Sequence, residues 1–303
     1  MRGLYSLSLG CIFSLILAGC ITGRFTGEQP AEQNEEIFQG VQYQRQVRDR
    51  PRPIVAHIIT IDLRQKGLSF LVTPGDPQAE LPLSARTTSQ FLDEFDLQLA
   101  INGDGFTPWR SNNPLDYYPH AGDRVKPNGL AASMGKTYAQ NPDNQPVFYI
   151  SRSNQASFNT PIGKVFNAIS GNTMLLEKGK SAFEAITQSD KEKGIQGGEA
   201  EDPGTPQPRT AIGLDKRGRK LVILVVDGRQ PGYSEGVTLK ELAEMMAALG
   251  IYNGMNLDGG GSTTLVSQGS NGEPVVLNSP IDQQVRGRER FVGNHLGVFT
   301  QPR

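Results

Sequence analysis

Six consecutive apolar residues at 221–226 require a strand that is buried on both of its faces. A strand with one face in water alternates apolar and polar residues, and this segment shows no such alternation. The run stops at Asp227, so a charged side chain is predicted at the end of a buried strand. Such a charge is costly to bury unless it has partners or a chemical role.

A helix and a second strand are predicted directly after this run. Thr238 and Glu241 have the spacing of a capping box, and the apolar residues that follow recur at helical spacing until Gly250. Residues 251–257 predict another strand, which ends at Asp258. Strand, helix and strand in this order predict a βαβ unit, in which the two strands are parallel.

The predicted unit brings Asp227 and Asp258 to one edge of a sheet, where α/β proteins bind their ligands. The two carboxylates are candidates for an acid, base, nucleophile or cation-binding pair. The chain also contains 35 Gly and 20 Pro, which favour many turns and short strands over a helical bundle. We therefore predict a mixed α/β or α+β fold: a strand-rich single domain with a mixed β-sheet core, flanking helices and one βαβ unit carrying the site.

The charge balance argues against a nucleic-acid partner. There are 30 Lys and Arg against 31 Asp and Glu, so the formal net charge is −1 and no general basic field exists. The three His have no paired spacing, which disfavours a zinc site.

The N-terminal segment predicts export and a lipid anchor. An apolar run at 4–18 follows Arg2 and leads to Gly19 and Cys20, the layout of a bacterial signal peptide with a lipoprotein cleavage site. We expect a signal peptide at 1–19, a tether at 20–52 that is acylated at Cys20 and contains one strand near 41–47, and a folded domain at 53–303. This predicts a lipoprotein held at the membrane of the cell envelope through its lipid.

Further polar motifs stand at predicted strand ends. Gly259, Gly260 and Gly261 expose backbone amides that could approach a phosphate, although a tight turn explains them equally well. The lysine of a nucleotide-binding phosphate loop is missing, which argues against an ATPase. Arg209 precedes a strand, and another strand leads into 102–105.

Five motifs in this order resemble the phosphodiester glycosidase family. They are Asn-Gly-Asp-Gly-Phe at 102–106, Pro-Arg-Thr-Ala-Ile-Gly at 208–213, Val-Asp-Gly-Arg at 226–229, Asn-Leu-Asp-Gly-Gly-Gly-Ser-Thr-Thr at 256–264 and Val-Gly-Asn-His-Leu-Gly-Val at 292–298. The first motif departs from the family pattern, because Asp104 stands where a second glycine is expected. That residue either adds a carboxylate to the site or alters its selectivity.

The resemblance implies hydrolysis of a sugar-1-phosphodiester, which releases the sugar and leaves the phosphate as a monoester. It implies that Asp258 and Asp227 act as base, nucleophile or oxocarbenium stabiliser, and that Arg209 binds the phosphate. The implied substrate-binding residues are Asn102, Gly103, Asp104, Thr210, Gly228, Arg229, Asn256, Gly259, Gly260, Gly261, Ser262, Thr263 and Asn294. His295 is as consistent with a core position as with a role in the site.

Two other functions remain open at this point. One is a lipid-anchored carbohydrate-binding protein without catalysis, and the other is a metal-dependent phosphodiesterase that cleaves the P–O bond. No cofactor is required, although the three aspartates Asp104, Asp227 and Asp258 offer oxygen ligands suited to Mg²⁺ or Ca²⁺. The expected partners are a glycan or glycosyl phosphodiester in a surface polysaccharide or glycolipid. The sequence leaves the sugar and the oligomeric state open.

Overall fold

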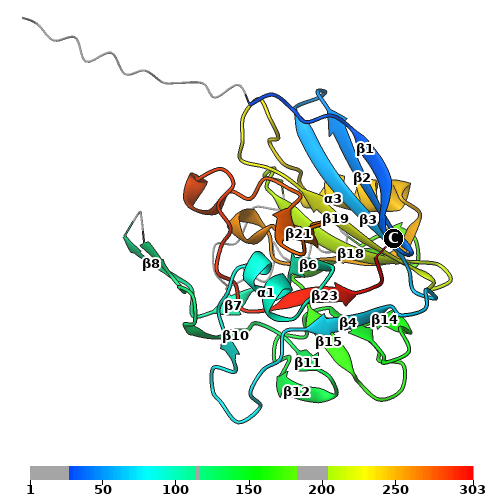
Figure 1. The fold of residues 1–303 in the computed structure, drawn as a ribbon, viewed down its shortest axis with the longest axis vertical. Coiled ribbons are helices and arrows are strands. Elements are labelled where there is room, and N and C mark those ends of the chain that lie inside the picture. Colours follow the sequence, from blue (N-terminus) through cyan, green and yellow to red (C-terminus); the bar gives the residue numbers. More distant parts are fainter. Residues whose placement is uncertain (1–26, 114–115, 183–203, 303) are drawn as a thin grey trace, which may run out of the picture.

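A computed structural model describes residues 27–113, 116–182 and 204–302. Within these ranges the chain forms five sheets and two α-helices, arranged as in Figure 1. Every pairing between named strands is antiparallel. The predicted signal peptide (1–19) and the lipidation site Cys20 lie outside the described residues.

The largest sheet has eight strands. Their order across the sheet is β1 (Gln33–Phe38), β2 (Val41–Arg48), β3 (Ile54–Asp62), β19 (Lys220–Val226), β18 (Arg209–Asp215), β20 (Ile251–Asn256), β16 (Thr173–Glu177) and β17 (Lys180–Ser181).

Two five-stranded sheets pack against one face of this large sheet. The first comprises β22 (Pro274–Val276), β21 (Leu265–Gln268), β6 (Leu99–Asn102), β23 (His295–Phe299) and β4 (Ser69–Val72). The second comprises β12 (Lys136–Ala139), β11 (Ala131–Ser133), β15 (Asn167–Ser170), β13 (Val147–Ile150) and β14 (Ala156–Phe158).

The remaining strands are short. A three-stranded sheet contains β5 (Leu83–Ser84), β10 (Arg124–Pro127) and β7 (Phe106–Thr107), and a hairpin contains β8 (Arg110–Asn113) and β9 (Asp116–Tyr118). In Figure 1 the end of the hairpin marked by β8 projects away from the body of the molecule.

Apolar cores lie on both faces of the large sheet. One core joins it to the five-stranded sheets, as in the contact of Ile223 on β19 with the cluster that includes Ile101 on β6. On the opposite face, Leu224 belongs to the core that α3 (Leu239–Ala248) covers with Leu242 and Met246. The prediction of a strand buried on both faces is therefore confirmed, and alternate residues of 221–226 serve alternate cores.

The helices begin where their caps require. Thr238 and Glu241 form both hydrogen bonds of the predicted capping box at the start of α3, and Gly250 follows its end with φ +77°. Helix α1 (Thr88–Glu94) has a capping box as well and covers the outer face of the sheet that contains β6. Among the described residues, Gly260–Ser262 and Asp282–Gln284 form single-turn 3₁₀ helices.

The predicted fold class is wrong. The core is not a mixed sheet, because all of its strand pairings are antiparallel, and the described residues contain two short α-helices in place of a flanking layer. The predicted βαβ unit fails because β18 lies between β19 and β20 and pairs with both. β18 directly precedes β19 in the chain and lies outside the strand, helix and strand segment, so that local pattern could not reveal its pairing with β20.

With β18 between them, β19 and β20 still run in the same direction, as the sequence predicted. Since β19 and β20 are each antiparallel to β18, they run the same way and end at one edge of the sheet. The beginning of β18 lies at that edge too, because Arg209 pairs with Val226 at the end of β19.

The folded part begins earlier than predicted. Residues 20–52 were expected to be a tether with one strand near 41–47. That strand is present as β2, but β1 also lies within this range and β2 pairs along its whole length with β3. On β1 only Phe38 is buried and on β2 only Val41 and Tyr43 are buried, so this largely polar hairpin at the edge of the sheet resembles a linker in sequence.

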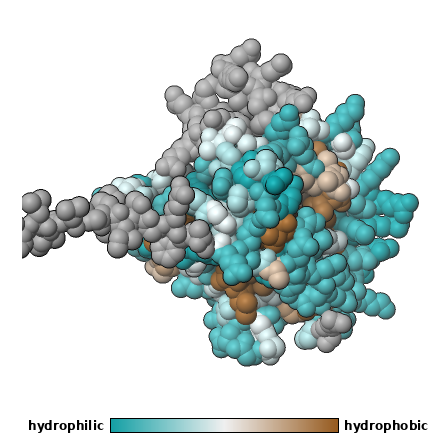
Figure 2. All heavy atoms as spheres, turned by 90° about the horizontal axis from the view of Figure 1, so that it is seen from above, coloured by the Kyte–Doolittle hydropathy of each residue, from teal (hydrophilic) through white to brown (hydrophobic). Residues whose placement is uncertain are grey.

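The surface is mainly polar. The face in Figure 2 is largely hydrophilic and carries small apolar patches. Among the described residues, no helix combines the length and the hydropathy needed to cross a membrane.

Candidate active site

The site lies where strand ends of two sheets meet. The backbone N–H of Asp258, just after β20, donates to the carbonyl of Gly103, just after β6 (3.0 Å). The side-chain amide of Asn102 donates to the carbonyl of Asp258 (2.7 Å). These two bonds bring the motif at 102–106 against the motif at 256–264, although about 150 residues separate them in the sequence.

Asp258 directly precedes the glycine loop, Gly259–Gly261. Its Oδ1 accepts the backbone N–H of Gly259 (2.9 Å), and the residue is part-buried. Burial raises the pKa of the Asp258 carboxyl, whereas the Ser262 hydroxyl and the charge of Arg290 act to lower it. The carboxylate thus faces both amide and cationic groups at the edge of the sheet.

Asp104 is the second carboxylate of the site. Its side chain is 1% exposed, and Oδ2 accepts the Ser170 hydroxyl (2.6 Å) and the Gly129 amide (2.9 Å). Its Oδ1 has no hydrogen-bond partner among the described residues. Burial raises the pKa of Asp104 to about 6, and the nearby charge of Asp258 adds to the rise. A buried carboxylate with one free oxygen and a pKa near neutrality has the properties of a general base.

Arginine side chains pack over the glycines that follow Asp258. A Cβ added at Gly260 would lie 3.0 Å from the Arg229 guanidinium, and one added at Gly261 would overlap that of Arg290. Arg290 is held by Asp282, which accepts its Nε at 2.7 Å. The absence of side chains on the loop therefore lets positive charge come close to its backbone.

Arg209 lies beneath the same loop. Its side chain is 2% exposed, and its guanidinium donates to the carbonyls of Val237 (3.2 Å) and Thr205 (3.3 Å). A Cβ on Gly259 would lie 3.9 Å from its Nη1. Arg209, the predicted phosphate ligand, is thus a buried cation below the loop. Arg229 borders Gly260, and Arg290 borders Gly261.

Sequence reasoning missed Arg290. It belongs to a segment at 286–290 that carries arginines at alternate positions, Arg286, Arg288 and Arg290. This local density of charge was the available signal. The segment has no helical or strand periodicity, so nothing in the sequence placed it beside the glycine loop.

Asp227 lies at the predicted edge but is held within a buried network. The residue is fully buried, and its Oδ1 accepts the side-chain amide of Asn278 (3.0 Å) and the backbone N–H of Ser279 (2.8 Å). Its Oδ2 contacts the His57 ring (3.1 Å) and accepts the Tyr233 hydroxyl (3.2 Å). A carboxylate with both oxygens bonded and no exposed surface acts as an anchor, here for the segment that follows β22.

Two predicted asparagines position the backbone of the site. Asn102 accepts the Thr210 hydroxyl (2.8 Å) and the Thr264 amide (3.1 Å) with its Oδ1. Asn294 accepts the backbone N–H of Asp104 (2.8 Å). These contacts hold four of the five sequence motifs together around the two carboxylates.

Several predicted polar groups have atoms that remain available. Among the described residues, the buried atoms without a partner include Asn256 Oδ1, Thr263 Oγ1 and Asn294 Nδ2.

Two of the glycines predicted to bind substrate are needed for close packing. A Cβ at Gly103 would overlap Asn294, and one at Gly228 would overlap Pro208.

The two buried histidines have structural surroundings. His295 stacks on Phe91 with ring centroids 4.6 Å apart, and burial lowers the pKa of His295 to about 3, which keeps it neutral. His57, to which the sequence assigned no role, joins Asp227 to the Tyr43 hydroxyl (2.8 Å). Within the described ranges, no three His, Cys, Asp or Glu side chains are grouped as metal ligands.

Gly261→Ala is expected to weaken substrate binding without unfolding the protein. The new methyl group would displace the flexible end of Arg290, so we expect KM for a glycosyl phosphodiester to rise about tenfold and the free energy of unfolding to change by less than about 1 kcal/mol. Steady-state kinetics and denaturant unfolding measure the two effects. If the effect acts through Arg290, Gly261→Ala will add little in an Arg290→Gln background, and additive losses would contradict this explanation.

The profile of the phosphodiester glycosidase family matches residues 95–299, which is more than half of the chain and contains both carboxylates and the glycine loop. The chain belongs to the phosphodiester glycosidase family. The family resemblance inferred from the five motifs is therefore confirmed, and with it the prediction of membership in a family of hydrolases.

Curated relatives match a short part of the chain. N-acetylglucosamine-1-phosphodiester alpha-N-acetylglucosaminidase of Bos taurus is 45% identical over 62 residues, and the same enzyme of Homo sapiens is 44% identical over 62 residues. Each match covers 20% of this chain and 11% or 12% of the relative. The chain thus spans a small fraction of the length of these relatives.

Solved structures with the same fold cover nearly all of this family member. The catalytic domain of the zebrafish N-acetylglucosamine-1-phosphodiester alpha-N-acetylglucosaminidase, auto-inhibited by its pro-peptide, gives a TM-score of 0.61 at 22% identity and covers 91% of this chain and 85% of that one. A hypothetical protein from Synechocystis gives a TM-score of 0.65 at 15% identity and covers 90% of this chain and 64% of that one.

Proposed function

We propose that this phosphodiester glycosidase hydrolyses a sugar-1-phosphodiester at the bond between the anomeric carbon and oxygen. The observation that carries the proposal is the placement of two carboxylates with raised pKa, Asp258 and Asp104, beside a glycine loop bordered by arginines. Carboxylate pairs perform glycoside hydrolysis, and guanidinium groups with backbone amides bind phosphate.

The residues divide the chemistry between them. Arg290, Arg229 and the loop amides bind the phosphate and stabilise the negative charge that develops on it. Asp258 lies between this phosphate site and Asp104, in the place where it can face the anomeric carbon and stabilise an oxocarbenium-like transition state. Because a phosphate monoester is a weakly basic leaving group, the reaction needs no strong general acid.

The proposed step balances as a hydrolysis. The bond between the anomeric carbon and the phosphate oxygen breaks, and its electron pair stays with the phosphate. The oxygen of water bonds to the anomeric carbon, and one proton of that water passes to Asp104. The products are a free sugar and a phosphate monoester on the other component.

The proposed setting is the bacterial cell envelope. The predicted signal peptide at 1–19 and acylation at Cys20 support an exported lipoprotein, and the net charge of −1 supports a substrate other than nucleic acid. A surface polysaccharide or glycolipid with sugar-1-phosphodiester bonds is the proposed substrate. The printed names of the curated relatives suggest N-acetylglucosamine as the first sugar to test.

The test is hydrolysis of an N-acetylglucosamine-1-phosphodiester in ¹⁸O-labelled water, with and without EDTA. We expect free sugar that carries the label, at the same rate in both conditions. Label in the phosphate, together with sugar phosphate and a loss of rate in EDTA, would identify a metal-dependent phosphodiesterase. Saturable binding without any product, across several sugars, would identify a carbohydrate-binding protein.

A further inference from the structure

A closed surface loop at 282–288, the 282–288 loop, presents an apolar side chain to solvent. The backbone N–H of Asp282 donates to the carbonyl of Arg288 (3.1 Å), so the two ends of the loop are tied together. Between them Val285 is 48% exposed, and it is one of four large apolar side chains that are exposed among the described residues. A single exposed apolar side chain is common on soluble proteins, so its surroundings decide what it means.

The exposed charges of this loop are positive. Arg286 and Arg288 are both exposed. The acidic residues of the same segment are engaged within the protein: Asp282 accepts from Arg290 (2.7 Å), and Glu289 accepts a backbone N–H of α1 (3.0 Å). The loop therefore presents one apolar side chain together with two cations, a combination that suits the interface of an anionic bilayer.

The first described residues of the chain pack against the base of this loop. A Cβ added at Gly27 would overlap the Arg286 guanidinium. The side-chain amide of Gln29 donates to the carbonyl of Tyr233 (2.9 Å), and the Arg286 guanidinium lies 4.2 Å from the centre of the Tyr233 ring. The chain thus joins the folded body directly beside the two exposed cations.

The length of chain before Gly27 limits how far this loop can lie from a lipid anchor. Cys20, the proposed acylation site, is seven residues before Gly27, and seven residues span at most roughly 25 Å when fully extended. In Figure 1 the first described residues, in dark blue, and β12 lie at opposite ends of the molecule. An anchor at Cys20 therefore keeps the 282–288 loop close to the bilayer and leaves the β12 end farther from it.

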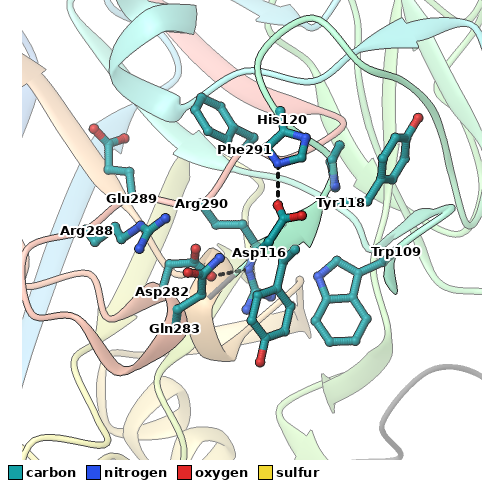
Figure 3. A pocket seen from close by; sticks show the side chains of 12 residues that line it. Trp109, Asp116, Tyr118, His120, Asp282, Gln283, Arg288, Glu289, Arg290 and Phe291 are labelled. Carbon is teal, nitrogen blue, oxygen red and sulfur yellow. Dashed lines mark hydrogen bonds and ion pairs between the residues drawn. The ribbon is translucent and has the colours of Figure 1, made fainter. Parts of the chain in front are cut away.

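Arg290 connects this loop to the active site. Its guanidinium lies 5.5 Å from the centre of the Trp109 ring, and its Nη1 lies 3.4 Å from the Ser262 hydroxyl. Figure 3 shows Arg290 in contact with Asp282, and Arg288 on the side of Asp282 away from Trp109. The exposed cations and the cation that borders the glycine loop thus belong to one short segment.

We propose that the 282–288 loop rests on an anionic bilayer surface and turns the active site toward phosphodiesters carried by lipids of that membrane. The proposal rests on the proposed function, which supplies the acyl anchor at Cys20 and the hydrolysis of a glycosyl phosphodiester. Val285 enters the headgroup layer, and Arg286 and Arg288 lie against lipid phosphates. The substrate class is thereby narrowed from a surface polysaccharide or glycolipid to the glycolipid.

A second copy of the same basic sequence provides an internal control. The sequence Arg-Gly-Arg occurs at 286–288 and again at 217–219, in the turn between β18 and β19. That turn lies at the opposite edge of the large sheet from the site, because β18 begins at the site with Arg209. Charge alone would bring both sequences to the lipid, whereas the proposal assigns this contact to 286–288.

The test measures which end of the anchored protein touches lipid. Residues 20–303 retain every described residue and contain a single cysteine, Cys20, so coupling to a maleimide lipid anchors the protein at the proposed acylation site. Trp109→Phe removes the only native tryptophan. In that background Val285→Trp is compared with Met134→Trp, whose position in the turn between β11 and β12 is 56% exposed.

The readout is quenching of tryptophan emission by vesicles of phosphatidylglycerol and brominated phosphatidylcholine. We expect the brominated lipid to remove at least half of the emission of Val285→Trp and less than a tenth of that of Met134→Trp. Equal quenching at the two positions, or no quenching at either, would overturn the proposal.

Arginine variants test the charge of the docking surface in the anchored Val285→Trp protein. Replacement of Arg286 and Arg288 by glutamine should reduce the quenching at least threefold, and replacement of both by lysine should preserve it. Replacement of Arg217 and Arg219 by glutamine should leave the quenching unchanged. Equal losses in the two glutamine pairs, or full quenching without Arg286 and Arg288, would overturn the assignment.

A kinetic comparison keeps this proposal distinct from the proposed function. The chain attached through Cys20 is compared with a Cys20→Ser chain attached through Met134→Cys, both on vesicles that carry a glycosyl phosphodiester lipid. We expect the lipid to be hydrolysed at least tenfold faster with the Cys20 attachment, and a soluble methyl diester at equal rates.

The outcomes separate the two proposals. Equal rates on the lipid would overturn the docking surface and leave the hydrolysis standing. Quenching confined to Val285→Trp, without hydrolysis of either diester by the wild-type chain, would support the docking surface and remove the proposed function.

Discussion

Asp104→Asn is expected to lower kcat/KM by about 10²–10⁴-fold, the usual contribution of a general base. In the wild type, the rate should rise with pH up to about 6 and level off above it, because Asp104 has a pKa of about 6 and accepts a proton only when ionised. The variant should lose this limb of the profile. Measurement of kcat/KM from pH 4.5 to 8 tests both expectations.

The same substitution should stabilise the folded protein above pH 6. The native state binds the proton of Asp104 more tightly than the unfolded state, so this group's contribution to the free energy of unfolding declines as pH rises from 3.8 through about 6. The decline corresponds to about 3 kcal/mol. Asparagine carries no charge to desolvate and can still accept from Ser170 and Gly129, so it should recover most of that stability.

Asp62→Asn is the matched control for both measurements. The hydrogen bond from Arg64 lowers the pKa of Asp62 to about 2, so its pH dependence has the opposite sign. That carboxylate adds stability above its unfolded pKa and loses it as pH falls toward 2, and its removal should leave kcat unchanged. An Asp104→Asn enzyme that keeps more than a tenth of the wild-type rate, or unfolds more easily at pH 8, would contradict the assignment of a buried base.

Asp258→Asn is expected to lower kcat by at least about 10³-fold, since this carboxylate is the group beside both the loop amides and the arginines. Phosphate binding should become tighter at the same time, because a negative charge next to Arg290 and Arg229 is removed. Stopped assays give kcat, and calorimetric titration with inorganic phosphate gives the affinity.

The neighbouring Asp227→Asn separates chemistry from architecture. Asp227 ends the next strand but one in the sheet, and its carboxylate accepts from Asn278 and Ser279 within a buried network. We expect this variant to lower the free energy of unfolding while kcat per folded molecule stays within about tenfold. A catalytic loss as large as that of Asp258→Asn would show that Asp227 takes part in the reaction.

The sequence predicted the parts of the fold that depend on contacts between residues close together in the chain. The capping box at Thr238, the helix stop at Gly250 and the doubly buried run at 221–226 each depend on contacts whose periodicity is visible in the sequence. Strand direction was also recovered, because Asp227 and Asp258 follow strands that end at the same edge.

Pairings between distant segments could not be read in this way. The pairing of β18 with β20, which follows α3 in the chain, placed β18 between β19 and β20 and made an antiparallel sheet out of an expected parallel unit. The partners of Asp227 lie about 50 residues away in an irregular segment, so the sequence could not show that its carboxylate accepts from Asn278 and Ser279. Arg290 was missed for the same reason, because only the tertiary fold brings it to Gly261.

The two carboxylates and the aromatic side chains near them lie on different elements of the fold, which matters for engineering and for divergence among relatives. The two carboxylates are fixed by bonds between the ends of β6 and β20, whereas Trp109 and Tyr117 belong to β8–β9 and its approach. Exchange of residues 109–118 is therefore expected to keep the bonds between these strand ends, while it changes the ring against which Arg290 packs. Libraries aimed at new glycans should vary this hairpin and leave the strand ends unchanged.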